Sequence, residues 1–245
     1  MTGTYKLADL NIRITSEFEE THQLLRDYRS CPGSPTDMDV RTWHQDLEYE
    51  RQRALQEDLR EERMPRSLPD PYLETLAVYR KIAEQLPEKG RLLMHGSCIS
   101  VDGCAYLFTA KSGIGKSTHT GLWREMLKDR AVMVNDDKPV LGISEKGVTA
   151  YGTPWDGKHR LSRNIAVPLK AVCILERAEE NRIQKMSAME AYPMLLQQIY
   201  RPMDTEMLGR SLELIDRLSK NVSLWHLCCN ISLEAAEIAY NAMKE

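Results

Sequence analysis

The chain has 245 residues, of which 42% are hydrophobic, and 33 Lys and Arg residues against 36 Asp and Glu residues give a formal net charge of −3. This length allows one large domain, or a core with a smaller appendage, and the composition excludes an intrinsically disordered chain. The small negative charge gives no support for a nucleic acid or a membrane as the partner, and no apolar run approaches the roughly 20 residues of a membrane span.

The N-terminal segment and the cysteines predict a cytoplasmic protein. Residues 1–15 contain neither the basic segment nor the apolar run of a signal peptide. The six cysteines form no Cys-x-x-Cys pair, and without export they are expected to be reduced thiols. Cys228 and Cys229 are adjacent, which is poor geometry for a metal site, so we interpret both as small buried hydrophobic residues.

Residues 1–90 are predicted to form a small α+β region. Apolar and polar residues alternate over 5–14 as in a strand, although the alternation slips once near Asp9. Residues 45–66 carry many charges of both signs and predict an exposed helix. An apolar stripe at helical spacing predicts a second helix over 73–86.

Residues 91–245 are predicted to form an α/β core, with the boundary near Pro87–Gly90. Short apolar runs between turn residues are typical of buried strands, whereas longer periodic segments predict helices. The expected strands cover residues 92–94, 99–102, 105–109, 131–134, 139–144, 147–151, 169–175 and 222–227. The expected helices cover residues 116–128, 187–199, 205–219 and 232–243. We therefore expect a twisted mixed sheet that is flanked by helices.

A glycine-rich segment between an expected strand and an expected helix matches the Walker A pattern, except that Ala110 replaces the first glycine. Its glycines let the backbone turn its N–H groups toward phosphate oxygens, and the helix that follows adds its N-terminus. A lysine in this position contacts the β- and γ-phosphates, and the next hydroxyl binds Mg²⁺. The predicted nucleotide-binding residues are Lys111, Ser112, Gly113, Ile114, Gly115, Lys116, Ser117 and Thr118. The alternative interpretation is a plain glycine-bearing turn.

Two acidic residues, Asp136 and Asp137, follow the strand that is expected at 131–134. Ligands bind outside the carboxyl ends of strands in open α/β sheets. One carboxylate beside a phosphate loop can hold Mg²⁺, and its neighbour can accept a proton from an attacking hydroxyl. Neighbouring strand residues point to opposite faces, which suits two separate roles. The alternative is that the pair merely ends a strand at the surface.

These features in this order resemble the kinase core of the HPr kinase/phosphorylase family. The resemblance rests on His95-Gly96, the hairpin that follows it, the phosphate-loop segment Lys111–Ser117 and the Asp136-Asp137 pair. It covers residues 91–175, and 176–245 more loosely. The family shares its nucleotide-binding fold with the phosphoenolpyruvate carboxykinases, so the resemblance implies an HPr kinase/PEP carboxykinase-like core.

The resemblance also implies roles for five residues. Lys116 and Ser117 would bind the phosphates and the Mg²⁺ of ATP. Asp136 would be the general base, and Asp137 would be a carboxylate on the metal side. His95 would lie near the acceptor. The family further implies a homo-oligomer.

Two departures from the family pattern indicate a divergent paralogue rather than an authentic HPr kinase. Residues 1–90 do not resemble the N-terminal domain of the family, and its Glu-x-Arg-Gly-x-Gly stretch is missing. The segment Gly152-Thr-Pro-Trp-Asp-Gly-Lys158 stands in its place. We therefore expect the chain to have its own hydroxyl acceptor, which can be a small molecule, a peptide or a protein serine.

Loops on a rigid α/β scaffold commonly hold substrate contacts. In the segment after residue 152, Trp155 can stack on a ligand, and Lys158 or Arg160 can clamp a phosphate. Arg201, which follows the helix expected at 187–199, can face the cleft. The alternative is a solvated turn with a capping tryptophan.

The predicted function is an ATP-dependent phosphotransferase that moves the γ-phosphoryl group to a hydroxyl acceptor, with GTP or pyrophosphate left open as donors. A second hypothesis is a non-enzymatic nucleotide sensor, in which residues 1–90 report occupancy to a partner. A third is a carboxykinase-like enzyme that acts on a small carboxylic acid. That enzyme would need more basic and metal-binding residues in the cleft than the sequence offers.

Overall fold

The computed structural model describes residues 1–245 and divides them into two compact units, Met1–Gln85 and Leu86–Glu245. The boundary that the sequence predicts near residue 90 lies a little further along the chain, after the short 3-10 helix η2 (Leu86–Lys89). No helix combines the length and the apolar character that crossing a membrane requires.

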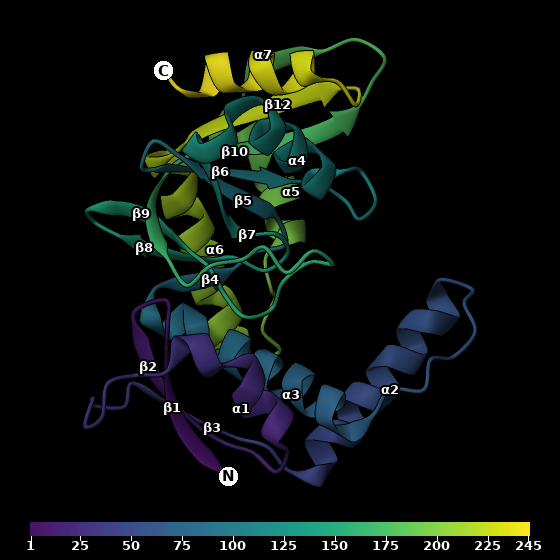
Figure 1. Ribbon diagram of the computed structural model, residues 1–245, viewed down its shortest axis with the longest axis vertical. Helices are drawn as coiled ribbons and strands as arrows, with labels where there is room; N and C mark the ends of the chain where they lie inside the picture. Colours follow the sequence, from purple (N-terminus) through teal and green to yellow (C-terminus); the bar gives the residue numbers. More distant parts are fainter. The chain divides into compact units, whose positions relative to one another are not determined.

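The N-terminal unit, drawn in purple to blue in Figure 1, is a three-stranded sheet with three α-helices. The strand order is β1-β2-β3, with β1 antiparallel and β3 parallel to β2. The strands are β1 (Thr2–Leu7), β2 (Leu10–Thr15) and β3 (Met38–Arg41). The helices are α1 (Glu19–Leu24), the 3-10 helix η1 (Arg26–Tyr28), α2 (His44–Arg60) and α3 (Asp70–Gln85).

The structure has a hairpin where the sequence predicts one strand over 5–14. Ala8 and Asp9 have φ angles of 50° and 62°, and they form the two-residue turn between the paired residues Leu7 and Leu10. Two consecutive residues with positive φ are the signature of a tight hairpin turn. The slip in alternation near Asp9 is therefore the point where the chain reverses.

A buried carboxylate organises the core of this unit. Glu74 on α3 is 1% exposed, and it accepts hydrogen bonds from the backbone N–H groups of Glu17 and Phe18 and from the hydroxyls of Thr21 and Thr42. These four donors satisfy the two oxygens of a group that would otherwise be costly to bury. Glu74 therefore ties α3 to the start of α1 and to the end of β3.

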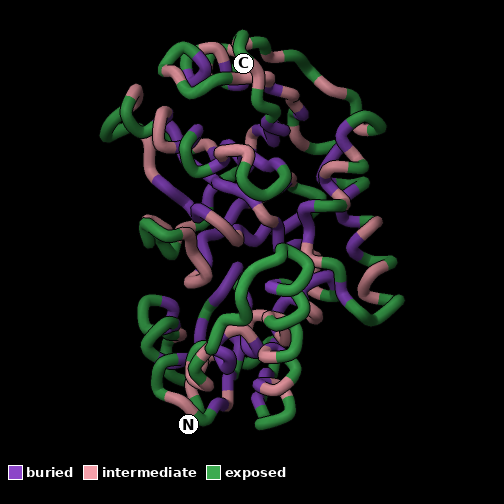
Figure 2. The backbone as a smooth tube through the Cα atoms, turned by 90° about the vertical axis from the view of Figure 1, so that its right-hand side faces the viewer, coloured by how far each residue is buried: buried purple, intermediate pink, exposed green.

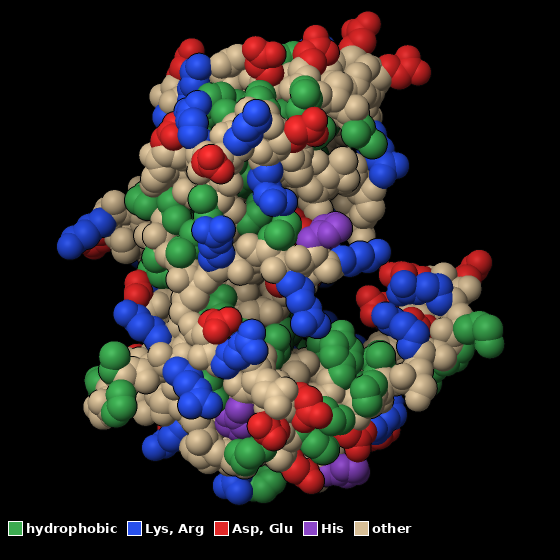
Figure 3. Space-filling model, viewed as in Figure 1, with side chains coloured by type: hydrophobic (Ala, Val, Ile, Leu, Met, Phe, Trp, Pro, Cys, Tyr) green, Lys and Arg blue, Asp and Glu red, His purple; other side chains and the backbone are tan.

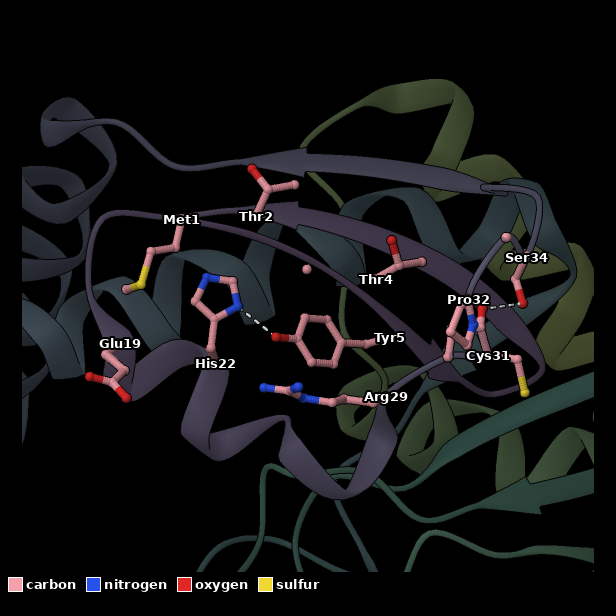
Figure 4. A pocket seen from close by; sticks show the side chains of 13 residues that line it. Met1, Thr2, Thr4, Tyr5, Glu19, His22, Arg29, Cys31, Pro32 and Ser34 are labelled. Carbon is pink, nitrogen blue, oxygen red and sulfur yellow. Dashed lines mark hydrogen bonds between the residues drawn. The ribbon is translucent and has the colours of Figure 1, made fainter.

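The surface of the N-terminal unit has two notable features. Helix α2 carries acidic and basic side chains close together, as the expected exposed helix does, but it ends at Arg60 rather than near residue 66 (Figure 3). A hollow of about 660 Å³ lies beside β1, between α1 and residues 29–34 (Figure 4). In it, the Tyr5 hydroxyl lies 2.5 Å from Nδ1 of His22. None of the residues that the sequence predicts for a site lines this hollow.

The C-terminal unit is built on a mixed sheet with the order β4-β8-β9-β10-β6-β5-β7, to which β12 adds on β10 and β11 adds on β12. Its strands are β4 (Arg91–Leu93), β5 (Ser97–Val101), β6 (Cys104–Thr109), β7 (Ala131–Asn135), β8 (Val140–Ser144), β9 (Gly147–Tyr151), β10 (Ala166–Arg177), β11 (Arg182–Lys185) and β12 (Ser223–Cys229). Its helices are α4 (Lys116–Leu127), η3 (Lys128–Arg130), α5 (Ala188–Gln198), α6 (Thr205–Asn221) and α7 (Leu233–Met243). The predicted α/β class with a mixed sheet is confirmed.

Strand β10 joins the two parts of this sheet. Its first residues pair antiparallel with β9. From Leu169 it runs parallel to β6, with an irregularity between Leu169 and Ala171, and from Ala171 it also runs parallel to β12. Exposed and buried residues alternate over 166–169, whereas residues 171–175 are all buried. Continuous burial is typical of a parallel strand that is covered on both faces.

Helices cover both faces of the central strands. On one face, Leu195 of α5 and Ile215 of α6 pack in a core that includes Leu107 and Val172 of the sheet. On the other face, α4 and α7 pack in a second core. Figure 2 shows buried segments of the chain gathered in the interior of this unit, with exposed segments around them. The carboxyl ends of β6, β10 and β12 lie at one edge, because these three strands are parallel.

The second core holds an aromatic cluster on α4. Trp123 is fully buried, and its Nε1 donates to Nε2 of His119 at 3.1 Å, while the ring of Phe108 packs edge-on against both residues. The Nδ1 atom of His119 is buried without a hydrogen-bond partner. Burial lowers the pKa of His119 from its ordinary value of 6.5 to about 4. The imidazole is therefore neutral in the folded protein at pH 7.

This histidine predicts a loss of stability in mild acid. Between pH 6.5 and pH 4 the unfolded chain binds a proton at His119 that the folded chain does not, so the free energy of unfolding falls as the pH falls through this window. The contribution is on the order of 3 kcal/mol across the window. His119→Gln keeps an acceptor for Trp123 but does not titrate.

Urea unfolding of the unmodified protein and of His119→Gln at several pH values between 4 and 7 tests this expectation. The slope of the unfolding free energy against pH should be shallower for His119→Gln than for the unmodified protein. His159→Gln, a change in an exposed loop, serves as the control and should keep the original slope. Equal slopes for all three proteins would contradict the origin that we give to the acid sensitivity.

Candidate functional site

The glycine-rich segment forms a tight loop between β6 and α4. Gly113 and Gly115 have φ angles of 79° and 116°, in the region that favours glycine, and α4 begins at Lys116 directly after them. Ala110 is buried and has no positive φ, so an alanine is accommodated in place of the first glycine. The first N–H groups of a helix have no intrahelical partner, and in α4 no side chain of the N-cap residue accepts from them.

Arg177, at the end of β10, holds the outer side of this loop. Its Nε donates to the carbonyl of Ile114 at 3.1 Å, and its Nη2 donates to the carbonyl of Gly113. In a trans peptide the N–H of the next residue points opposite to the carbonyl, so the N–H of Gly115 points away from Arg177, toward the inner side of the loop. The sequence gives no sign of this role of Arg177, because 63 residues separate it from Ile114.

Lys116 is buried at the start of α4. Its side chain is 9% exposed, and its Nζ donates to the carbonyl of Ala110 at 3.0 Å. Burial lowers the pKa of the ammonium group, and the nearby carboxylates of Asp137 and Asp136 oppose this shift. The structure therefore brings the predicted lysine and both predicted aspartates into one electrostatic group.

Asp136 is buried beside the first turn of α4. Its side chain is 7% exposed, and its Oδ1 accepts a hydrogen bond of 2.6 Å from the hydroxyl of Ser97. The Ser97 oxygen in turn lies 2.7 Å from the hydroxyl of Thr120 on α4. This chain of hydroxyls joins the carboxylate to the helix that follows the loop.

Asp137 is more open and faces His95. Its side chain is 36% exposed, and its Oδ1 lies 3.4 Å from Nε2 of His95 and 3.6 Å from Nζ of Lys138. The pKa of His95 is lowered to about 4, first by burial and then by the positive charges of Lys138 and Lys116, although Asp137 opposes the shift. His95 is therefore neutral at pH 7. It can donate or accept a hydrogen bond there, but it carries no positive charge.

Asn135 is the residue that fixes the backbone of the acidic pair. It is fully buried, and its Oδ1 accepts from the N–H groups of Asp137 and Lys138 at 2.9 and 2.5 Å. Its Nδ2 donates to the carbonyls of Thr153 and Trp155 at 3.1 and 3.2 Å. The end of β7 and the segment after β9 are thus held together by one amide.

The segment after β9 packs against the acidic pair. Gly152 lies so close to the carbonyls of Arg163 and Val134 that an added Cβ would stand 1.8 and 2.6 Å from their oxygens. A Cβ on Gly157 would stand 2.8 Å from Oδ2 of Asp136. Neither position therefore accepts a larger residue without a shift of its neighbours.

The predicted substrate residues are brought to this region only in part. The main chain of Trp155 is hydrogen-bonded to Asn135, and its side chain is half-buried, whereas Lys158 and Arg160 are exposed in the same loop. Arg201 lies elsewhere. Residues 199 and 200 pair antiparallel with the segment that precedes His95, so the chain runs away from His95 toward the exposed Arg201.

Asp156 organises the loop from within. Its Oδ1 accepts from the N–H groups of Gly157 and Asp136 at 2.7 and 3.2 Å, and its Oδ2 accepts from the N–H of Ser162 at 2.7 Å. One carboxylate therefore closes the loop and joins it to the residue that begins the acidic pair.

Asp156→Ala is expected to loosen this loop, because the N–H groups of Gly157 and Ser162 lose their acceptor and the N–H of Asp136 keeps only the hydroxyl of Ser162. The free energy of unfolding should fall by about 1–3 kcal/mol. The amides of residues 156–162 should exchange hydrogen faster, whereas those of α7 should not change. Hydrogen exchange with mass spectrometry measures both, and Glu145→Ala, in the exposed turn between β8 and β9, is the control. Unchanged exchange over 156–162 would show that the carboxylate does not hold the loop.

Comparisons with known proteins place the chain in a family. The model of the family described as "SynChlorMet cassette protein ScmC" matches residues 72–232, which is more than half of the chain. The chain therefore belongs to the ScmC family. No curated protein matches it.

A solved structure with similarity to the chain is that of the HPr(Ser) kinase/phosphatase from Coxiella burnetii. The match has a TM-score of 0.35 and 11% sequence identity, and it covers 61% of this chain and 95% of that one.

Proposed function

We propose that this chain is an ATP-dependent phosphotransferase that moves the γ-phosphoryl group to a hydroxyl acceptor. The observation that carries the proposal is the juxtaposition of the uncapped N-terminus of α4, the buried ammonium of Lys116 and the two carboxylates of Asp136 and Asp137. Phosphoryl transfer depends on positioning and on charge stabilisation, and this is the set of groups that it requires.

The loop has the properties of a phosphate-binding site. The unpartnered N–H groups at the start of α4 and the positive end of the helix favour an anion. The hydroxyl groups of Ser117 and Thr118 are exposed beside them. Lys116 would exchange the Ala110 carbonyl for phosphate oxygens, which are stronger partners of an ammonium group.

The Mg²⁺ of Mg–ATP would offset charge on the phosphate oxygens when bound. In the proposed site its protein ligands are the hydroxyl of Ser117 and one carboxylate of the acidic pair. Asp136 is the better candidate for this ligand. It is the more buried of the two carboxylates, and hydrogen bonds through Ser97 link it to α4, on which Ser117 lies. This reverses the roles that the family resemblance implies for the pair.

The more open Asp137 suits the general base. A base must reach the hydroxyl of an acceptor that arrives from solvent, and Asp137 is the more exposed of the two carboxylates. The neutral imidazole of His95, 3.4 Å away, can orient the carboxylate or the acceptor hydroxyl by a hydrogen bond. The proton of the acceptor would move to Asp137 as the oxygen attacks the γ-phosphorus, while the bond between this phosphorus and the bridging oxygen breaks and ADP leaves with that oxygen.

Lys116→Ala tests the nucleotide site itself. Loss of a charge-assisted contact should weaken ATP binding by roughly tenfold to a hundredfold. Titration calorimetry with Mg–ATP measures the affinity, and thermal unfolding without nucleotide shows whether the variant is folded. Lys146→Ala, in the turn between β8 and β9, is the matched control and should bind ATP normally. Equal affinity of all three proteins would remove the basis for a nucleotide site at this loop.

The pair of variants Asp136→Asn and Asp137→Asn separates the two carboxylate roles. If Asp137 is the base, Asp137→Asn should bind Mg–ATP normally and lose transfer by roughly two or more orders of magnitude. Asp136→Asn should instead weaken the binding of ATP in Mg²⁺ but not in its absence. Transfer of labelled phosphate from ATP to a panel of metabolites and peptides is the measurement.

The outcomes of this experiment are distinguishable. The opposite pattern in the two variants would restore the assignment of Asp136 as the base. Tight ATP binding by the unmodified protein, without transfer to any acceptor and without ATP hydrolysis, would favour the nucleotide sensor instead.

A further inference from the structure

Three side chains with metal-binding atoms meet on one face of the sheet, at the carboxyl ends of β10 and β12. They are Glu176, His226 and Cys228, and their ligand atoms all lie within 4.8 Å of one another. In the parallel register Glu176 lies opposite Cys228, and Ile174 lies opposite His226. His226 and Cys228 are two residues apart on one strand and therefore point to the same side.

We infer that these residues form a binding site for a thiophilic divalent cation, with Zn²⁺ as the best fit. Thiolate, imidazole and carboxylate are the three ligand types that Zn²⁺ uses in proteins. Three protein ligands with one open position are typical of zinc sites that also bind water or another ligand. The cluster is distinct from the proposed Mg²⁺ site, because Mg²⁺ binds oxygen atoms and does not favour a thiolate.

The geometry needs only a small movement to form this site. Ligand atoms around tetrahedral Zn²⁺ are about 3.3–3.8 Å apart, as follows from metal–ligand distances of about 2.0–2.3 Å. Nε2 of His226 already lies 3.0 Å from Oε2 of Glu176. The Glu176 side chain is 64% exposed, whereas the imidazole of His226 is 23% exposed, so the carboxylate has more room to move than the imidazole.

The adjacent cysteine provides an internal contrast. Cys229 packs with Trp225 and Leu227 in the core beneath α4 and α7, on the opposite face of β12, and burial raises the pKa of its thiol. Cys228 is not part of that core and faces the cluster. The strand pleat therefore separates the two thiols, of which Cys229 faces the core and Cys228 faces the cluster.

A metal-free explanation exists for two of the three residues. Glu176 and His226 can form a plain ion pair, and Arg182, which lies opposite Cys228 on β11, adds a positive charge that opposes a cation. An ion pair between Glu176 and His226 does not require the thiol of Cys228. The two explanations therefore differ in whether Cys228 contributes to the binding of a cation.

The test is a titration of the full chain, kept reduced, with Co²⁺ as a spectroscopic substitute for Zn²⁺. We expect one equivalent of Co²⁺ to give a thiolate-to-cobalt charge-transfer band, and Zn²⁺ to displace it. Cys228→Ser should lose the band and bind Zn²⁺ roughly a hundredfold more weakly or worse, because the loss of an outer partner of a metal ligand already costs 10–100-fold. Cys229→Ser is the matched control and should keep the band.

Two further variants test the remaining ligands. Glu176→Gln should weaken the binding of Zn²⁺, whereas Glu180→Gln, in the turn between β10 and β11, should not. Thermal unfolding without metal shows that each variant is folded. Absence of the band in the unmodified protein, or a band that survives Cys228→Ser, would overturn the inference. A Co²⁺ ion held at Ser117 and the aspartates would give no thiolate band, so the result does not depend on the proposed phosphotransfer.

Discussion

The amide of Asn135 is the interaction on which the candidate site depends. It lies at the end of β7, it is fully buried, and both of its polar atoms are used by backbone groups. One side holds the main chain of the acidic pair, and the other side holds the segment that follows β9. A valine or leucine in this place would fill the volume but would leave these backbone groups buried without partners. The neutral amide of Asn135 thus fixes the main chain that carries the two carboxylates, although it takes no part in the proposed chemistry.

The local parts of the molecule are those that the sequence predicts well. The strand β6, the turn with two glycines and the amphipathic α4 are contiguous, and apolar spacing and glycine content are enough to predict them. Even the slip of alternation near Asp9 carries correct information, although it marks a hairpin and not an irregular strand. Local pattern is informative wherever the partners of a residue lie within a few positions of it.

The parts that the sequence does not predict depend on contacts between distant segments. Arg177 reaches the glycine loop because β10 runs beside β6, and nothing in the residues around Arg177 indicates that pairing. Likewise, the hydroxyl of Ser97 reaches Asp136 because β5 pairs with β7. The two adjacent cysteines, 228 and 229, differ only through the layers above and below their strand. Strand order sets all of these contacts.

The charges around Lys116 constrain what the proposed site can bind. Lys116 and Lys138 carry two positive charges, Asp136 and Asp137 carry two negative charges, and His95 is neutral at pH 7, so the formal charges of this group cancel. Lys116 and Asp136 are buried, and the opposite charges near them offset part of the cost of that burial when no ligand is bound. Because the four formal charges sum to zero, the group has no net positive charge to neutralise a triphosphate, although the start of α4 contributes a partial positive charge. In the proposed site, a divalent cation that entered with the nucleotide would supply the missing charge, and the acidic pair would then bind this cation rather than repel the phosphates.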